Sequence, residues 1–214
     1  VSANSTFITT DSAVFQATFN SANWSGDLVA LPVTAAGGVS AVPLWRASDR
    51  LPAFASRRLF TTNAAASPAT VTFDWSGLST AQRNLFGATD PARQEVINHL
   101  RGDPSREVRN GGPLRNRPTT VLGDIIHSSP VYVGDNNTVF VGSNSGFLHA
   151  FNASTGDERF AFAPSSLLAH MPRLSDPNYV RRYFVDGELA VSQRANTGGR
   201  NILVGFLGRG GRGL

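Results

Sequence analysis

The chain has 214 residues, of which 41% are hydrophobic and 16% charged, so it is long enough for one or two domains with a sizeable core. Its 21 Gly, 12 Pro, four Glu and complete lack of Lys favour an all-β protein over a helical one. The 19 basic residues are all Arg and are scattered, which argues against a nucleic-acid partner despite the net charge of +4, and the lack of Cys excludes disulfides.

The first third of the chain predicts short strands separated by turns. Alternating apolar residues and turn formers place these strands at 14–19, 24–33, 39–45, 58–62 and 70–73. Residues 28–45 carry no charge, but Pro and Gly interrupt them, so a β-hairpin explains them better than a membrane span. We therefore expect no direct membrane insertion, and we assign residues 1–78 to an early blade or a preceding β-region.

The only helical signals lie in the middle of the chain. Residues 79–86 predict a short helix capped by Ser79. Asp90, followed by a proline, predicts the N-cap of a second helix with one apolar stripe over residues 96–100, and Gly102 supplies the residue after its end. The charged, Gly- and Pro-bearing segment that follows, 106–118, predicts a loop or linker. Residues 79–120 are thus a helical insertion with a linker.

The last part of the chain returns to strands. The predicted strands are at 131–133, 138–142, 147–152 and 158–162, with short turns rich in Gly and Asn between them. Four antiparallel strands joined by tight turns form one blade of a β-propeller. Residues 182–185 and 201–207 begin another blade, and residues 202–205 match 139–142. We assign residues 121–214 to one complete blade and the first part of the next.

The second blade stops early, at Leu214, before its remaining strands. We therefore expect the chain to be a fragment of a longer protein. An apolar strand without its outer neighbour leaves backbone donors and acceptors available to another chain, so we also expect self-association.

A short motif occurs twice and relates the two β-regions. Residues 25–31 have the pattern S-G-x-L-x-A-L, and residues 145–151 have the pattern S-G-x-L-x-A-F. A small repeated β-unit cannot bury its own apolar face and must stack on its neighbours. The predicted fold is therefore all-β, a partial β-propeller with a small helical insertion.

One tripeptide is a candidate receptor-binding site. Arg101, Gly102 and Asp103 present a basic and an acidic group around a glycine, a pattern that integrins recognise in other contexts. Three residues are a weak motif, and a helix end followed by a turn explains the same residues better.

Acidic turns are the candidate metal ligands, and a structural role is favoured for each. Residues 135–137 (Asp-Asn-Asn) offer oxygens to calcium, but a turn between strands requires the same residue types. Residues 157–158 and 186–188 are interpreted in the same way, as turn residues. No complete calcium loop of the D-x-[DN]-x-[DN]-G type occurs, so no cofactor or metal site is predicted in this chain.

The sequence also offers no catalytic site. The four histidines lack metal-ligand spacing, and His149, which alternates with Phe147 and Phe151, is predicted to pack inside a blade. No G-x-S-x-G elbow supports a catalytic triad. Core packing between sheets best explains the aromatic residues at strand spacing, which are Trp24, Trp45, Trp75, Phe147, Phe151, Phe160 and Phe162.

Two family resemblances follow from these motifs. Residues 128–134 (SSPVYVG), 139–143 and 148–156 resemble the repeat of quinoprotein-type propellers. More specifically, the chain resembles the PilC/PilY family of type IV pilus biogenesis proteins and tip adhesins, at the start of their carboxy-terminal propeller. The matching stretches include residues 19–31, 73–85, 97–105, 114–134 (LRNRPTTVLGDIIHSSPVYVG), 142–172 and 182–187.

The PilC/PilY resemblance implies a non-enzymatic surface protein that promotes pilus assembly, counters pilus retraction and contributes to adhesion and twitching motility. It implies pilus subunits (minor pilins) and host or surface receptors as partners. The implied location is the cell surface or pilus tip, reached through the periplasm or outer membrane. By the same resemblance, calcium is expected only in downstream parts of the full-length family members, and no cofactor is expected in this chain. The alternatives are a fragment of a quinoprotein-like, pyrroloquinoline-quinone-dependent dehydrogenase and a fragment of a periplasmic scaffold propeller.

Overall fold

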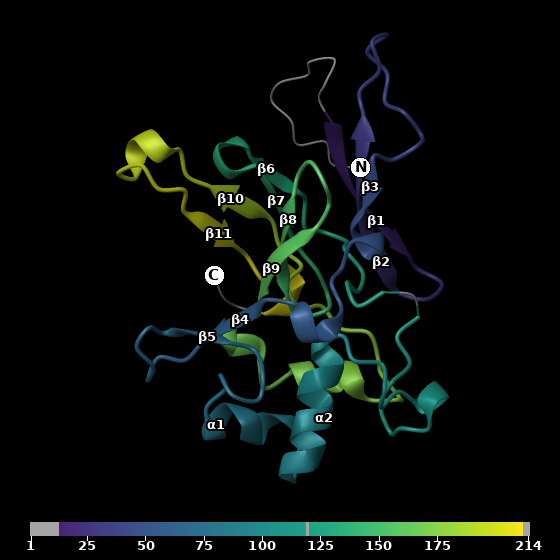
Figure 1. Ribbon diagram of the computed structural model, residues 1–214, viewed down its shortest axis with the longest axis vertical. Coiled ribbons are helices and arrows are strands. Elements are labelled where there is room, and N and C mark those ends of the chain that lie inside the picture. The colour runs from purple at the N-terminus through teal and green to yellow at the C-terminus, as the bar shows by residue number, and fades with distance from the viewer. Residues whose placement is uncertain (1–12, 119, 212–214) are drawn as a thin grey trace.

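The computed structural model describes residues 13–118 and 120–211, and its regular structure is mostly strand, with two α-helices at one end (Figure 1). The strands form three sheets, ordered β1-β2-β3, β5-β4-β9-β8-β7-β6 and β10-β11. The strands are β1 (Ala13–Asn20), β2 (Ser25–Pro32), β3 (Trp45–Arg46), β4 (Leu59–Thr62), β5 (Thr70–Thr72), β6 (Val131–Val133), β7 (Thr138–Gly142), β8 (Leu148–Asn152), β9 (Glu158–Phe162), β10 (Leu189–Val191) and β11 (Leu203–Gly205). The prediction of an all-β chain with a small helical part is confirmed.

The four strands β6 to β9 form the antiparallel unit that the sequence predicts, with each strand paired to the next in chain order. Their connections use the expected turn residues. Asn137 closes a 3-10 turn at residues 134–136 with φ +52°, and Gly146 and Gly156 adopt φ +92° and +78°. Because L-residues other than Asn rarely adopt such angles, these turns fix the register of the four strands.

The central sheet is wider than the predicted blade. Strand β4 pairs with β9 in parallel, with Leu59 opposite Ala161 and Phe60 opposite Phe162, and β5 extends the sheet beyond β4. The amide of Ala161 donates to the carbonyl oxygen of Arg58 at 3.0 Å. A segment about one hundred residues earlier in the chain therefore satisfies the outer backbone edge of β9.

Two predicted strands are wrong in their position. Residues 182–185 form no strand, because the amide of Phe184 donates to the Asn144 side chain at 2.8 Å and that of Val185 donates to the Ser143 carbonyl oxygen at 3.3 Å. Backbone pairing in this region begins at residues 186–187, just before β10, where the amide of Gly187 donates to the carbonyl oxygen of Phe206 at 3.0 Å. The strand predicted over 39–45 is likewise reduced to a single bridge between Val33 and Val39 and to the short β3.

The helical part begins as the sequence predicts. The side chains of Ser79 and Gln82 form a capping box at the start of α1 (Thr80–Arg83), and residues 84–86 continue as a 3-10 turn. Helix α2 (Asp90–Arg101) starts one residue earlier than expected, with Thr89 as its N-cap, and ends at Gly102, where φ is +124°. No helix within the described part of the chain is both long enough and apolar enough to span a membrane.

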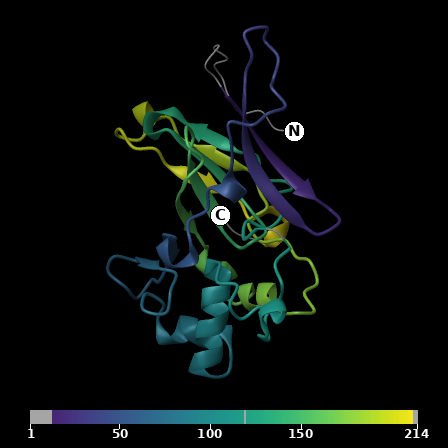
Figure 2. The same ribbon diagram turned by 45° about the vertical axis from the view of Figure 1, so that its right-hand side comes forward.

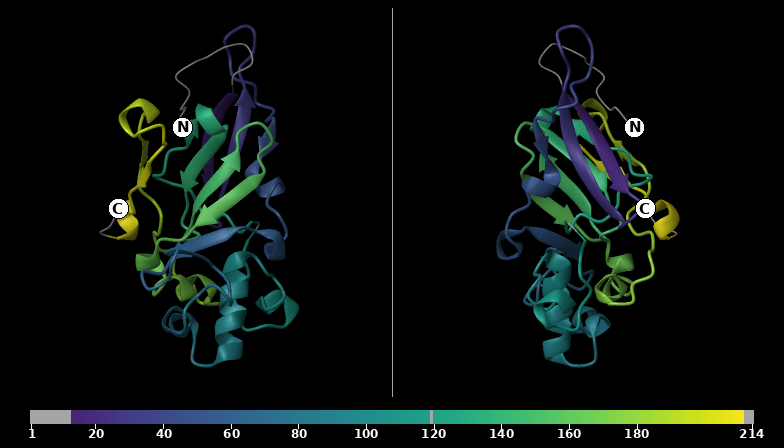
Figure 3. Two further views of the ribbon diagram at one scale, coloured as in Figure 1. Left: turned by 60° about the vertical axis from the view of Figure 1, so that its left-hand side comes forward. Right: turned by 90° about the vertical axis from the view of Figure 1, so that its right-hand side faces the viewer.

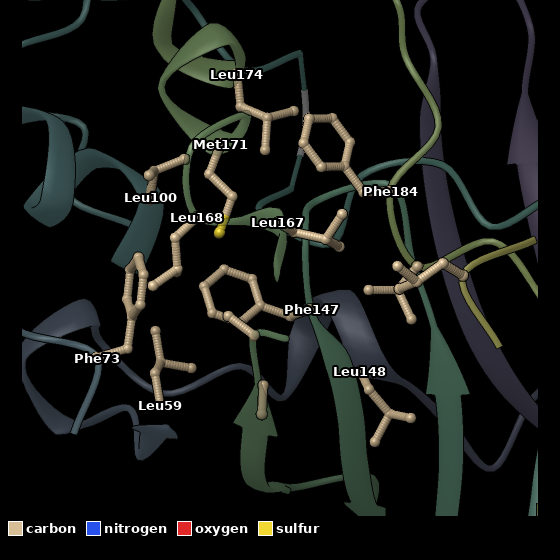
Figure 4. Packing of buried hydrophobic residues seen from close by; sticks show 14 of the residues in the cluster. Leu59, Phe73, Leu100, Phe147, Leu148, Leu167, Leu168, Met171, Leu174 and Phe184 are labelled. Atoms are coloured by element: carbon tan, nitrogen blue, oxygen red, sulfur yellow. The ribbon is translucent and has the colours of Figure 1, made fainter. Parts of the chain in front are cut away.

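The central sheet is covered on both faces (Figures 2 and 3). One face packs against β1–β3 and the other against β10–β11, while the helical part lies at one end of the sheets. On the β1–β3 side, Val139, Val141 and Phe151 meet Leu28 and Ala30, all at most 5% exposed. The core on the other side is shown in Figure 4. It contains Leu59, Phe73, Leu100, Phe147, Leu148, Leu168, Met171, Leu174 and Phe184.

Candidate functional site

The predicted receptor tripeptide lies at the end of α2, but its arginine is buried. Arg101 is 8% exposed, and its guanidinium donates to the carbonyl oxygen of Phe73 at 2.8 Å and to two further carbonyls. Asp103 accepts a hydrogen bond from the amide of Ser105 at 2.9 Å and so forms a turn. Receptor binding by the tripeptide stays a prediction, and it would require Arg101 to give up its carbonyl partners.

A buried ion pair connects the helical part to the central sheet. Arg57 donates to Glu158 through Nε and Nη2, both at 2.7 Å, and the two side chains are 2% and 1% exposed. A third donation, from Nη1, reaches the carbonyl oxygen of Arg101 at 2.9 Å. The interpretation of residues 157–158 as turn residues is therefore wrong for Glu158, which is a buried member of β9 with a fixed cationic partner.

His149 extends this ion pair into a longer polar network. Its Nδ1 lies 2.9 Å from Oε1 of Glu158, and its Nε2 lies 3.2 Å from the hydroxyls of both Ser143 and Ser145. Burial, more than any other influence, lowers the pKa of His149, so the ring is neutral at pH 7. A neutral ring beside a carboxylate carries its proton on Nδ1, and Nε2 then accepts from a serine hydroxyl.

This network has the order of a serine–histidine–carboxylate triad, although the sequence shows no elbow motif. Its surroundings favour a structural role. His149 is fully buried, its Nε2 atom is shared by two hydroxyls, and Arg57 already binds the carboxylate of Glu158 through two nitrogens. The prediction that His149 packs within the strand unit is confirmed. Sequence reasoning missed the network because Glu158 and Arg57 lie on different segments that only the fold brings together.

A second polar network lies between the segment before β6 and the segment before β10. Asn144, 2% exposed, donates to Asp124 at 2.8 Å and to Asp186 at 3.3 Å. Arg181 lies 2.6 Å from the carboxylate of Asp124, and the imidazole of His127 lies 2.6 Å from that of Asp186. The interpretation of residues 186–188 as a simple turn is therefore wrong for Asp186, which is 1% exposed.

Trp24 contradicts the expectation that the tryptophans fill the space between sheets. It closes the β1–β2 hairpin with φ +52°, a rare angle for an aromatic residue, and is 41% exposed. The guanidinium of Arg181 lies between its ring and that of Tyr183, at 4.4 and 4.0 Å from the two ring centroids. Arg181 thus joins the hairpin tip to the segment before β10. Trp45, in contrast, is buried as predicted, and its Nε1 donates to the carbonyl oxygen of Ala153 at 3.0 Å.

A small cavity of about 40 Å³ lies beside Trp24 and the two networks. Among residues 13–118 and 120–211, no group of three His, Cys, Asp or Glu side chains is arranged to hold a metal ion. The cavity is lined by Trp24, His99, Leu100, Arg115, Arg117, Pro118, Thr120, Val121, Gly123, Asp124, Asn144, Ser145, Leu174 and Tyr179.

Comparison with known proteins gives a consistent set of relatives. A type IV pilus biogenesis factor PilY1 homologue of Xylella fastidiosa (strain Temecula1) is 37% identical over 243 residues, which cover 100% of this chain and 19% of that protein. The type IV pilus biogenesis factor PilY1 of Pseudomonas aeruginosa is 32% identical in strain UCBPP-PA14 and 30% in strain PAK, covering 94% and 90% of this chain and 20% of each relative. No protein-family model and no solved structure matches the chain.

These matches first define a class, bacterial proteins named for type IV pilus biogenesis. The chain belongs to the PilY1 family. It spans about a fifth of the length of the curated relatives that it matches.

Proposed function

We propose that this chain is a non-enzymatic, rigid β-scaffold segment of a type IV pilus biogenesis protein at the cell surface or pilus tip. The observation that carries the proposal is its similarity, over 90–100% of its length, to proteins named for pilus biogenesis. Loops supported by the sheets would contact pilus subunits (minor pilins) during assembly, and surface or host receptors during adhesion and twitching motility.

The packing of the sheets supports a scaffold made of repeated units. In the repeated motif, Leu28 and Ala30 face the central sheet, and the equivalent Leu148 and Ala150 face the core toward β10–β11. Each sheet thus turns the same motif residues toward the sheet that follows it in the chain. The pairing register also repeats, since Ala30 lies opposite Trp45 and Ala150 lies opposite Phe160. Successive, similarly oriented sheets are how propeller blades stack, and we propose that arrangement here.

The proposal can be tested in a bacterium whose pilus assembly depends on the gene. Gly156 and Gly111 have nearly the same φ, +78° and +80°. A Cβ at Gly156 would lie 2.6 Å from the ring of Trp45, whereas a Cβ at Gly111 would have no atom within 4 Å. Gly156→Ala should therefore loosen the stacking of β1–β3 on the central sheet and reduce surface pili and twitching, while Gly111→Ala, equally strained in its backbone, should not.

Two outcomes contradict the proposal. Normal pili in a strain from which the whole segment has been deleted would show that the segment has no part in assembly. Loss of pili in Ser145→Ala, with the protein present at its normal level and with an unchanged melting temperature, would indicate a catalytic serine and therefore an enzyme. We expect Ser145→Ala to assemble pili normally.

A further inference from the structure

Arg115 is a cation without an ionic partner beside the small cavity. Its guanidinium lies 4.1 Å from the ring centroid of Tyr179, so one face of the group is covered. Its Nε atom is buried and lacks a hydrogen-bond partner in the described part of the chain. Within residues 13–118 and 120–211, no carboxylate oxygen lies within 4.0 Å of this guanidinium. The charge of this guanidinium is therefore not neutralised by a directly paired carboxylate, and a ligand that brings a negative charge against it would be favoured.

The other charged groups that line the cavity are already satisfied. Arg117 donates to Glu107 at 2.8 Å, and Asp124 pairs with Arg181 at 2.6 Å. Burial, together with the charge of Arg117, lowers the pKa of His99 to about 4, so this imidazole is neutral at pH 7. Desolvation also lowers the pKa of Arg115. Glu107 and Asp124 attract the Arg115 guanidinium without pairing with it, and each is already paired with another arginine. The cavity therefore has an excess of positive charge, and an anion is the ligand that this charge selects.

The size of the cavity limits which anion fits. A cavity of about 40 Å³ has room for about three water-sized groups. A carboxylate has three heavy atoms and is planar, and a guanidinium can bind it through two parallel hydrogen bonds. Thr120 can add a donor, because its oxygen accepts from the amide of Leu122 and its hydroxyl proton remains available. A bulkier, tetrahedral phosphate fits this space less well.

We propose that this cavity is a carboxylate-binding site in which Arg115, held against Tyr179, pairs with a carboxylate of a partner protein. Trp24, which is 41% exposed, is one of the residues that line this cavity. The carboxylate can come from an Asp or Glu side chain or from the C-terminus of a protein chain. The proposal rests on the cavity alone and does not depend on a role in pilus assembly.

The test is a titration of the purified chain with sodium acetate at constant ionic strength, followed by the NMR signal of the Arg115 Nε–H group. We expect a saturable shift with a dissociation constant of about 1 mM, as is reasonable for a four-atom ligand. Arg115→Gln should weaken acetate binding at least tenfold, measured by calorimetry. The matched control Arg200→Gln, which removes an exposed arginine that does not line the cavity, should leave acetate binding unchanged.

Peptide-binding experiments distinguish a chain terminus from an acidic side chain as the source of the carboxylate. If a short peptide with a free C-terminus binds and its C-terminal amide does not, the natural ligand is a chain terminus. If an amidated peptide that contains Glu binds as tightly as the peptide with a free C-terminus, the natural ligand is an acidic side chain. The proposal is overturned if acetate gives no saturable shift, if phosphate binds more tightly than acetate, or if both arginine variants lose affinity equally. If Arg115→Gln fails to fold, Arg115→Lys keeps the charge without the planar fork and should still bind more weakly than the parent chain.

Discussion

The sheets on the two sides of the central sheet are packed to different extents. On the β1–β3 side, Leu28 and Ala30 are fully buried and Trp45 is only 4% exposed. On the other side, Leu203 of β11 is half-buried, and the alternate residues Ile202 and Val204 are 51% and 37% exposed on the outer face of the sheet. The β10–β11 sheet is therefore packed on one face only and leaves apolar side chains on its outer face exposed.

The largest expected effect comes from replacing one leucine by alanine in the sheet on each side of the central sheet. Leu28→Ala should destabilise the chain by about 3 kcal/mol, because it leaves a cavity between two packed sheets. Leu203→Ala removes the same atoms from a half-buried site and should cost about 1 kcal/mol. Urea unfolding of both variants measures the difference. Equal losses would mean that the two interfaces are equally tight and that the comparison is wrong.

The second-largest effect is expected from lowering the pH, which should weaken the Arg57–Glu158 ion pair of the central sheet. Burial would raise the pKa of Glu158, but the hydrogen bonds from Arg57 and His149 lower it from 4.5 to about 2. Because the folded-state pKa is the lower one, this group stabilises the fold above pH 4.5 and loses that contribution as the pH falls toward 2. The loss should be about 3 kcal/mol, measured as the free energy of unfolding across this window. A flat profile between pH 4.5 and 2 would show that the ion pair does not form.

Two substitutions in the turn that leads into β8 are expected to cost less stability, and by different amounts. Gly146 has φ +92°, and a Cβ there would lie 2.8 Å from the Cε atom of Met171 in the core. Gly146→Val should therefore cost about 2 kcal/mol through strain and overpacking. Ser143→Ala removes a hydroxyl partner of His149 and should cost about 1 kcal/mol. The prediction fails if thermal midpoints of the two variants coincide.

The smallest effect on stability, but a clear effect on association, is expected at the outer face of β10–β11. Val204 lies between Ile202 and Phe206 along the chain, and these two residues are 51% and 42% exposed. Apolar residues alternating along an edge strand favour pairing with another chain. Val204→Lys should reduce concentration-dependent association in analytical ultracentrifugation, with a change in unfolding free energy within about 0.5 kcal/mol. If the parent chain is monodisperse at high concentration, the β10–β11 sheet does not pair with other chains and the prediction is wrong.

The sequence alone determined the elements whose cause is local. Strands β6 to β9 follow from apolar alternation and from turn residues that accept positive φ, such as Asn137 and Gly146. The ends of the helical part follow from the Ser79 capping box and from Gly102. These features depend on neighbours a few residues apart, so a linear pattern carries them.

The tertiary structure decided the rest, because it depends on groups far apart in the chain. The parallel pairing of β4 with β9, the Arg57–Glu158 ion pair and the unpaired Arg115 beside Tyr179 each join segments separated by more than 60 residues. A charged side chain is either solvated in a turn or buried against a partner, depending on which distant segment packs over it. The local sequence pattern contains no information about that distant segment. For the same reason the sequence identified Arg101 as a surface candidate, while the fold buries its guanidinium among backbone carbonyls.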